Sequence, residues 1–216
     1  FRTSHEIQKV EYFDNEDVMD LVDWDAISAF RNNSLNPENS VTRGTAQNPD
    51  IYFQSREAAN KFYEGIPDLV EEYMQEITKK TGRTYHPFVY HGVKDAENII
   101  VAMGSINDTI LETVNYLNDQ GQKVGLIVVH LYRPFSEKYF RKVLPSTVKK
   151  ISVLDRTKEL GANGEPLYLD IKDIFYNDEN APMILGGRYG LSSKDTTPAM
   201  IMSVYENMQS NNPKIH

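Results

Sequence analysis

The sequence of 216 residues contains no cysteine. A disulfide, a thiolate nucleophile, a zinc–thiolate site or an iron–sulfur cluster therefore cannot be built from this chain alone. No apolar run approaches the roughly 18 residues that a membrane-spanning helix needs, and no signal-peptide pattern opens the chain. It starts at Phe1 rather than Met, so we expect a piece of a longer, cytoplasmic protein.

Basic residues are also fewer than acidic residues. The chain has 23 Lys and Arg against 31 Asp and Glu, which gives a formal net charge of −8. Nucleic-acid backbones and anionic membranes bind clustered Lys and Arg, so we expect neither as a partner. In contrast, 40% of the residues are hydrophobic and 11% are aromatic, which is enough for a packed core.

The first 54 residues differ from the rest of the chain. Seven acids between residues 11 and 25 predict a solvated acidic face. Residues 32–54 are rich in Asn, Pro, Gly and Ser, and they predict a long irregular connector. From Arg56 the pattern is helical, with a break near Gly65 that Pro67 imposes. We therefore divide the chain into residues 1–54 and a domain of residues 55–216.

Strands and helices alternate in the second part. Continuous apolar runs predict strands over 98–104, 126–131, 151–154 and 182–187. Strands that are apolar without alternation belong to parallel sheets covered on both faces. The sequence therefore predicts an α/β fold, an open and mainly parallel sheet with helices on both faces. In such folds the carboxyl ends of the strands form the functional edge.

A charged loop follows the strand at 151–154. Asp155, Arg156, Lys158 and Glu159 stand within five positions, and two glycines follow before a helix that begins at residues 165–166. An active-site loop, a docking loop and a solvated turn all fit this pattern. We interpret the four charged residues as a cluster that orders the loop and faces a neighbouring domain.

Two arginines at the same edge are further candidates. Arg133 follows the strand at 126–131, where it can clamp a carboxylate or phosphate or pin a loop, and we favour the structural role. Arg188 stands among three glycines in residues 186–195. Both a functional and a structural role stay open for Arg188.

Other candidate chemistry is incomplete. "MGSIND" (103–108) places one glycine before a helix that Ser105 is expected to cap, but neither G-x-G-x-x-G nor G-x-x-x-x-G-K-[ST] occurs. His130 is expected in the core, and His86 with His91 lacks a third metal ligand. Asp170 is expected on a solvated helix face. The residues alone thus predict no catalytic, cofactor-binding or metal-binding residue.

Several long stretches together resemble one enzyme family. They are "FRTSHEIQK" (1–9), "RGTAQNPDIYFQSREAAN" (43–60), "GLIVVHLYRPF" (125–135), "VLDRTKELGANGEPLYLD" (153–170) and "GGRYGLSSKD" (186–195). In this order they resemble pyruvate:ferredoxin (flavodoxin) oxidoreductase, whose members are several times longer than this chain.

The resemblance implies a function for the full-length protein. It would oxidatively decarboxylate pyruvate with coenzyme A to acetyl-CoA and CO₂, and reduce ferredoxin or flavodoxin. Its cofactors would be thiamine diphosphate, Mg²⁺ and [4Fe–4S] clusters, in a cytoplasmic homodimer. Residues 1–54 would be the tail of the pyrimidine-side thiamine diphosphate domain, and residues 55–216 a domain like the C-terminal domain of transketolase.

The same resemblance places the cofactor contacts outside this chain. We therefore expect a structural segment whose partners are the other domains of the same polypeptide. The alternative is a stand-alone nucleotide- or CoA-binding α/β module, which would use residues 103–108, Arg133 and the loop at 155–164.

Overall fold

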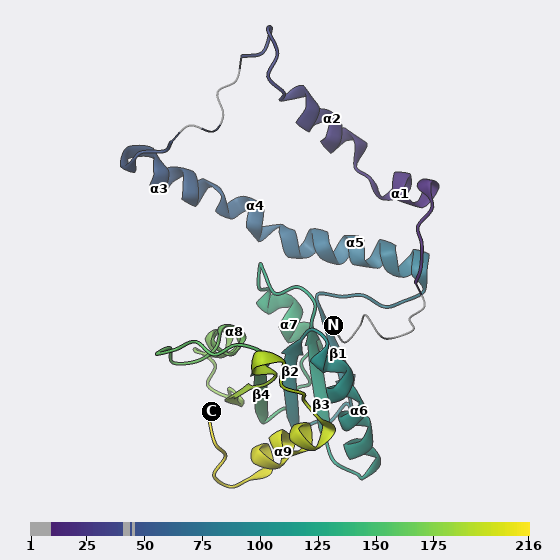
Figure 1. Ribbon diagram of the computed structural model, residues 1–216, viewed down its shortest axis with the longest axis vertical. Helices are drawn as coiled ribbons and strands as arrows, with labels where there is room; N and C mark the ends of the chain where they lie inside the picture. The colour runs from purple at the N-terminus through teal and green to yellow at the C-terminus, as the bar shows by residue number, and fades with distance from the viewer. Residues whose placement is uncertain (1–9, 41–43, 45) are drawn as a thin grey trace. The chain divides into compact units, whose positions relative to one another are not determined.

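The computed structural model describes residues 10–40, 44 and 46–216, and the chain divides into two compact units (Figure 1). The first unit is Phe1–Tyr85 and the second is His86–His216. The stretch at 1–9 that contributes to the family resemblance lies outside the described residues. The boundary expected between residues 54 and 55 concerns the parent protein, and it stays a prediction.

The described part of the first unit is helical. Its helices are α1 (Asn15–Leu21), α2 (Trp24–Asn32), α3 (Pro49–Ala58), α4 (Asn60–Glu64) and α5 (Ile66–Thr81). The irregular connector was predicted to reach residue 54, but α3 already begins at Pro49. Proline suits the first helical position because its missing N–H has no partner there in any case.

The helix break was predicted correctly. Gly65 separates α4 from α5, Pro67 lies in the first turn of α5, and Gly82 ends that helix with a φ of 71°. The apolar stripe of this region forms but is only partly covered, since Ile66, Val70 and Ile77 are partly buried whereas Phe62 is 67% exposed. No residue of α1, α2, α3 or α4 is buried, and Pro67 is the one buried residue of α5. The described residues of this unit therefore build no hydrophobic core.

The second unit contains a five-stranded sheet in the order β1-β3-β2-β4-β5. The strands are β1 (Phe88–Gly92), β2 (Asn98–Met103), β3 (Val124–Val129), β4 (Lys150–Asp155) and β5 (Met183–Arg188). All neighbouring pairs are parallel except β1 with β3. The predicted fold class, an open and mainly parallel α/β sheet, is confirmed.

Strand β1 was not predicted. Its sequence FVYHG is short and includes a histidine, so it lacks the apolar run that marked the other strands. It is held by antiparallel pairing along the full strand, from Phe88 opposite Val129 to Gly92 opposite Gly125. An edge strand of this kind depends on its neighbour more than on its own composition.

Helices cover both faces of the sheet (Figure 1). They are α6 (Ile106–Asp119), α7 (Glu137–Val143), α8 (Pro166–Ile174) and α9 (Pro198–Gln209). Side chains of α7 and α8 pack with one face, and those of α6 and α9 pack with the other. Strand β2 serves both cores, because Val101 belongs to the first cluster and Ile100 to the second, and both side chains are fully buried.

The first residues of α9 and α7 differ in how they are capped. Thr197 caps α9 by accepting a hydrogen bond from the Met200 N–H. Ser136 precedes α7 but makes no side-chain capping bond, whereas Phe135 and Phe140 do meet, with ring centroids 6.2 Å apart. Within the part of the chain that the structure describes, no helix is long and apolar enough to cross a membrane.

Candidate functional site

The carboxyl ends of β2, β3, β4 and β5 lie at one edge, because these strands are parallel. After β2 the chain enters α6 on one face, and after β4 it enters α8 on the other. Neighbouring strands whose connections leave to opposite faces define the switch point where open α/β sheets bind ligands. In this sheet that point lies between Met103 and Asp155.

Tyr189 bridges the switch point from the loop after β5. Its hydroxyl donates a hydrogen bond of 3.2 Å to the carbonyl of Met103, and its N–H donates one of 3.1 Å to the carbonyl of Asp155. Burial raises the pKa of the Tyr189 phenol above its ordinary value. The usual ligand crevice is therefore occupied by a side chain of the domain itself. No sequence signal marked this role.

Asp155, the last residue of β4, is 4% exposed. Its Oδ1 accepts a hydrogen bond from the Leu167 N–H and its Oδ2 accepts one from the Tyr168 N–H, both at 3.1 Å. These donors belong to the first turn of α8, so Asp155 caps that helix from a distant position in the chain. Burial raises the pKa of its carboxyl, although the two N–H groups act in the opposite direction. Asp155 thus orders the loop from within the domain.

Arg188 holds a second buried carboxylate at this edge. Glu165 is 1% exposed, and its Oε1 accepts a hydrogen bond of 2.7 Å from Arg188 Nε. Lys158 Nζ lies 3.7 Å from the same oxygen. Burial alone would raise the pKa of Glu165, but the hydrogen bond and charge of Arg188 outweigh burial and lower it. The sequence marked Arg188 and Lys158 but not their common partner.

The rest of the charged loop is exposed. Arg156 Nε donates a hydrogen bond of 3.2 Å to the carbonyl of Gly190, and Lys158 Nζ donates one of 3.0 Å to the carbonyl of Glu159. Gly190 has a φ of 60°, and a Cβ there would lie 3.2 Å from Arg156 Nε. Leu160 is 90% exposed. The loop is therefore tied down at its base by Arg156, while Leu160 is presented to solvent.

Arg133 makes its contacts with other residues of the same domain. Its Nη1 forms an ion pair of 2.8 Å with Asp170 Oδ2, and its guanidinium lies 3.9 Å from the centroid of the Tyr132 ring. The prediction that Asp170 belongs to a solvated face is wrong, since 26% of its side chain is exposed and it faces this arginine. Burial raises the pKa of Tyr132 to about 12. The guanidinium of Arg133 thus connects the loop after β3 with α8.

His86, His91 and His130 form no metal centre within the part of the chain that the structure describes. His130 was expected in the core, but it follows the end of β3 and is exposed, with Nδ1 2.9 Å from the carbonyl of His86. His91 lies in β1, where burial lowers the pKa of its imidazole. Among residues 10–40, 44 and 46–216, no group of three His, Cys, Asp or Glu side chains can hold a metal ion.

The loop after β2 offers little to a phosphate. Gly104 adopts a φ of 80°, as a tight turn requires, but Ser105 makes no side-chain capping bond, so the predicted cap is wrong. A cavity of about 370 Å³ beside α6 is lined by His91, Asp108 and His130, among others. It has no Lys or Arg in its lining and one carboxylate, which disfavours an anion there.

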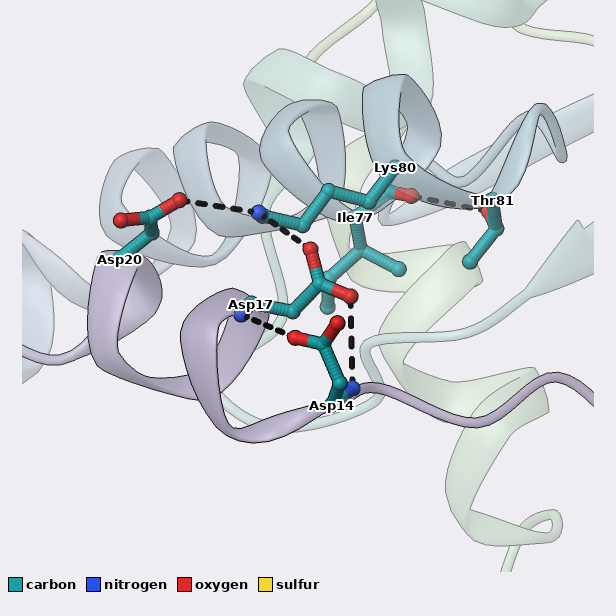
Figure 2. A network of polar contacts seen from close by, with 6 residues as sticks. All are labelled: Asp14, Asp17, Asp20, Ile77, Lys80 and Thr81. Carbon is teal, nitrogen blue, oxygen red and sulfur yellow. Dashed lines mark hydrogen bonds and ion pairs between the residues drawn. The ribbon is translucent and has the colours of Figure 1, made fainter.

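In the first unit, a polar network joins α1 to α5 (Figure 2). Lys80 Nζ lies 2.8 Å from Asp17 Oδ1 and 3.4 Å from Asp20 Oδ2. Asp14 caps α1 by accepting a hydrogen bond from the Asp17 N–H at 2.8 Å. The hydrogen bond from Lys80 lowers the pKa of Asp17, and the one to Asp17 raises the pKa of Lys80. The acidic stretch was predicted to be a solvated face, but some of its acids instead have these specific partners.

Two family models match this chain. "Pyruvate flavodoxin/ferredoxin oxidoreductase, thiamine diP-bdg" matches residues 1–75, and "Pyruvate:ferredoxin oxidoreductase core domain II" matches residues 96–201. The pyruvate-flavodoxin oxidoreductase of Enterobacter agglomerans is 56% identical over 99% of the chain, and the pyruvate:ferredoxin oxidoreductase of Moorella thermoacetica is 55% identical over 99%. The chain spans 18% of the length of each of these curated relatives.

Similar solved structures are more distant. A 2-oxoglutarate:ferredoxin oxidoreductase from Magnetococcus marinus is 19% identical, with a TM-score of 0.42 over 66% of this chain and 23% of its own. A split-gene transketolase is 13% identical, with a TM-score of 0.40 over 57% of this chain and 39% of its own.

Residues 86–216 thus form an open α/β domain whose switch point is bridged by its own tyrosine. Residues 1–75 of the first unit, which ends at Tyr85, match a thiamine diphosphate-binding model. The chain belongs to the pyruvate:ferredoxin/flavodoxin oxidoreductase family, and it corresponds to one segment of those longer proteins.

The iron–sulfur clusters and the Mg²⁺ that this family implies find no matching set of ligands among the residues that the structure describes. Iron–sulfur clusters need thiolates, and the chain has no cysteine. Mg²⁺ prefers grouped oxygen ligands, and the described residues contain no group of three His, Cys, Asp or Glu side chains that can hold a metal ion.

Proposed function

We propose that this chain is a non-catalytic, interdomain segment of a pyruvate:ferredoxin or pyruvate:flavodoxin oxidoreductase. The full-length enzyme would convert pyruvate and coenzyme A into acetyl-CoA and CO₂, and it would reduce ferredoxin or flavodoxin. The names and the identity of the relatives over 99% of the chain support this assignment.

The observation that carries the interdomain role is the uncovered apolar surface of the first unit. Large apolar side chains stay exposed along the three consecutive helices α3, α4 and α5. They are Ile51, Tyr52, Phe53, Phe62, Tyr63, Leu69 and Tyr73. Contiguous exposed apolar surface marks an interaction site, and helices without a core depend on tertiary packing for their stability. We infer that other parts of the parent polypeptide cover these helices.

The catalytic groups then lie in those other parts. Thiamine diphosphate supplies the carbanion chemistry when it is bound. This segment positions the domains that hold it, within what we take to be a cytoplasmic homodimer with Mg²⁺ and [4Fe–4S] clusters. The candidate interdomain contacts in the second unit are Arg156, Lys158 and Glu159, with Arg133 and Arg188 in internal ion pairs that hold the loops in place.

Reduction of methyl viologen by pyruvate and CoA tests this proposal. The purified full-length protein and the 216-residue chain are compared at equal molar concentration, with thiamine diphosphate and Mg²⁺ added to both. We expect turnover by the full-length protein and none by the chain. Pyruvate-dependent reduction by the isolated chain would falsify the non-catalytic role, and an inactive full-length protein with intact clusters would contradict the assigned reaction.

A further inference from the structure

We propose that the loops at 156–165 and 188–196 form one docking platform for another segment of the parent polypeptide, which inserts an apolar side chain into a cavity beside α9. The inference rests on the proposed function, because it names the surface through which the second unit meets the rest of the enzyme.

The two loops are fixed to each other at two points, and the second loop is also bound to the end of β4. Glu165 of the first loop pairs with Arg188 at the start of the second at 2.7 Å, and Arg156 Nε donates to the carbonyl of Gly190 at 3.2 Å. The Tyr189 N–H binds the carbonyl of Asp155 at 3.1 Å. Loops cross-linked in this way lose little conformational freedom when a partner binds, so less of the binding free energy is offset by ordering.

The platform contains an apolar cavity. Its volume is about 320 Å³, which accommodates one large side chain. The apolar side chains of the lining are Leu154, Leu191, Met200, Ile201 and Val204. Leu191 and Met200 are each 43% exposed at its mouth. Pockets that receive a single apolar anchor are the usual centres of protein interfaces.

Charges of both signs surround this cavity. Lys194 and Asp195 line its mouth, and the adjoining loop presents Arg156, Lys158 and Glu159. An apolar centre within a charged, exposed rim is the anatomy of a protein interface. The mixed signs favour a polypeptide with its own alternating charges over a small anion or a nucleic acid.

We expect the cavity to be occupied by another segment of the same polypeptide. The relatives are far longer than this chain, which spans 18% of their length, so the remainder supplies many candidate anchors. Covalent connection raises the effective concentration of such a segment, so a single anchor with a charged rim is sufficient for stable docking.

Cysteine labelling tests the platform, because the chain has no cysteine of its own. Leu160→Cys and Leu191→Cys place a thiol on each loop. Tyr176→Cys is the matched control, since Tyr176 is 84% exposed and follows the far end of α8, at the opposite edge of the sheet. Each variant is reacted with N-ethylmaleimide in the isolated chain and in the full-length protein, and the modified peptide is quantified by mass spectrometry.

We expect labelling at both loop positions to be about tenfold or more slower in the full-length protein than in the chain, with Tyr176→Cys unchanged. Equal rates at the loop positions in both proteins overturn the platform, even when the full-length protein reduces viologen dye with pyruvate. Slowing at Tyr176→Cys to the same extent also overturns it, because it shows general burial of the domain.

Two further outcomes would show that the platform binds a different molecule and not a segment of the same polypeptide. Concentration-dependent protection in the isolated chain indicates a second copy of the chain. Protection of the full-length protein only after ferredoxin or flavodoxin is added indicates the electron-transfer partner. Each variant is first matched to the parent chain by its thermal unfolding midpoint, and at each site a second variant, Glu159→Cys or Lys194→Cys, replaces one that fails to fold.

Discussion

The hydroxyl of Tyr189 lies 3.2 Å from the carbonyl oxygen of Met103, across the position where an open α/β sheet usually binds its ligand. Tyr189 reaches this carbonyl from the loop after β5, and β4 lies between the two strands. Because Tyr189 bridges the switch point, the crevice there is used for packing within the domain. This relationship agrees with a segment whose work is to position other domains.

Tyr189→Phe removes this hydrogen bond and keeps the ring. A hydrogen bond of this kind contributes about 0.5–1.5 kcal/mol, so we expect the free energy of unfolding to fall by that amount in urea denaturation. Tyr116→Phe is the control, because Tyr116 is 55% exposed on α6. An equal loss in both variants would show that the contact with Met103 adds nothing.

Asp155→Asn leaves one of the two α8 N–H groups facing an amide N–H in place of an oxygen. An unsatisfied buried donor costs about 1–3 kcal/mol, and urea denaturation near neutral pH measures this loss. Asp173→Asn, on the exposed side of α8, controls for the change of charge and should shift stability little.

The difference in stability between the wild type and Asp155→Asn should depend on pH. Burial raises the pKa of Asp155 above 3.8, so the native state holds this proton more tightly than the unfolded state. The bound proton stabilises the folded state fully below the pKa that Asp155 has in the unfolded chain. This stabilisation is lost as the pH rises through the pKa that Asp155 has in the folded chain. The stability advantage of the wild type over Asp155→Asn should therefore shrink as the pH rises above about 4. A growing advantage would contradict the raised pKa.

Arg188→Met leaves the carboxylate of Glu165 buried, with Lys158 at 3.7 Å and the backbone of Glu159 as its remaining partners. Removing one partner of a buried pair costs about 3–5 kcal/mol, and Lys158 should keep the loss near the lower end. The double variant Glu165→Gln/Arg188→Met should recover part of it. Arg133→Met is the matched control: 54% of the Arg133 side chain is exposed, so its pair with Asp170 should contribute only up to about 1 kcal/mol. Thermal and urea unfolding of the four proteins decide between these values.

Lys80→Gln should release α1 from α5 in the first unit. The variant loses the contacts to Asp17 and Asp20, whereas the control Lys79→Gln loses only a pair within α5, to Glu76. We expect faster amide hydrogen exchange in α1 for Lys80→Gln alone. Lys80 lowers the pKa of Asp17, so the protection is present above the ordinary value of 3.8 and is lost as the pH falls below it. Equal exchange in both variants would assign no role to the network.

The elements that sequence reasoning found are those with a strong local signal. Apolar runs located β2, β3, β4 and β5, and residues 165–166 marked the start of α8. These signals depend on burial on both faces and on capping chemistry, both of which are written in neighbouring residues.

The contacts of the candidate site have no such local signal. Asp155 binds N–H groups 12 and 13 residues away, and Tyr189 reaches Met103 across 86 residues. Strand β1 was missed because it depends on pairing with β3, and His130 was placed in the core because the strand was predicted to extend to residue 131, two residues beyond its end at Val129. Partners of this kind follow from the sheet order, which the sequence pattern alone does not contain.

The proposed interdomain role requires that the rest of the parent protein covers the apolar helices α3, α4 and α5. Phe53→Glu and Phe62→Glu test it through the thermal unfolding midpoint, measured in the isolated chain and in the full-length protein. Gln54→Glu, on the same helix as Phe53, adds the same charge without removing an apolar side chain. Phe53 and Phe62 are 70% and 67% exposed in the chain, so both changes should leave its midpoint nearly unaltered.

In the full-length protein, the same two substitutions would bury a charge against apolar surface. We predict a marked fall of the midpoint for Phe53→Glu and Phe62→Glu, and none for Gln54→Glu. An unchanged midpoint of the full-length protein in both phenylalanine variants would contradict the interdomain role.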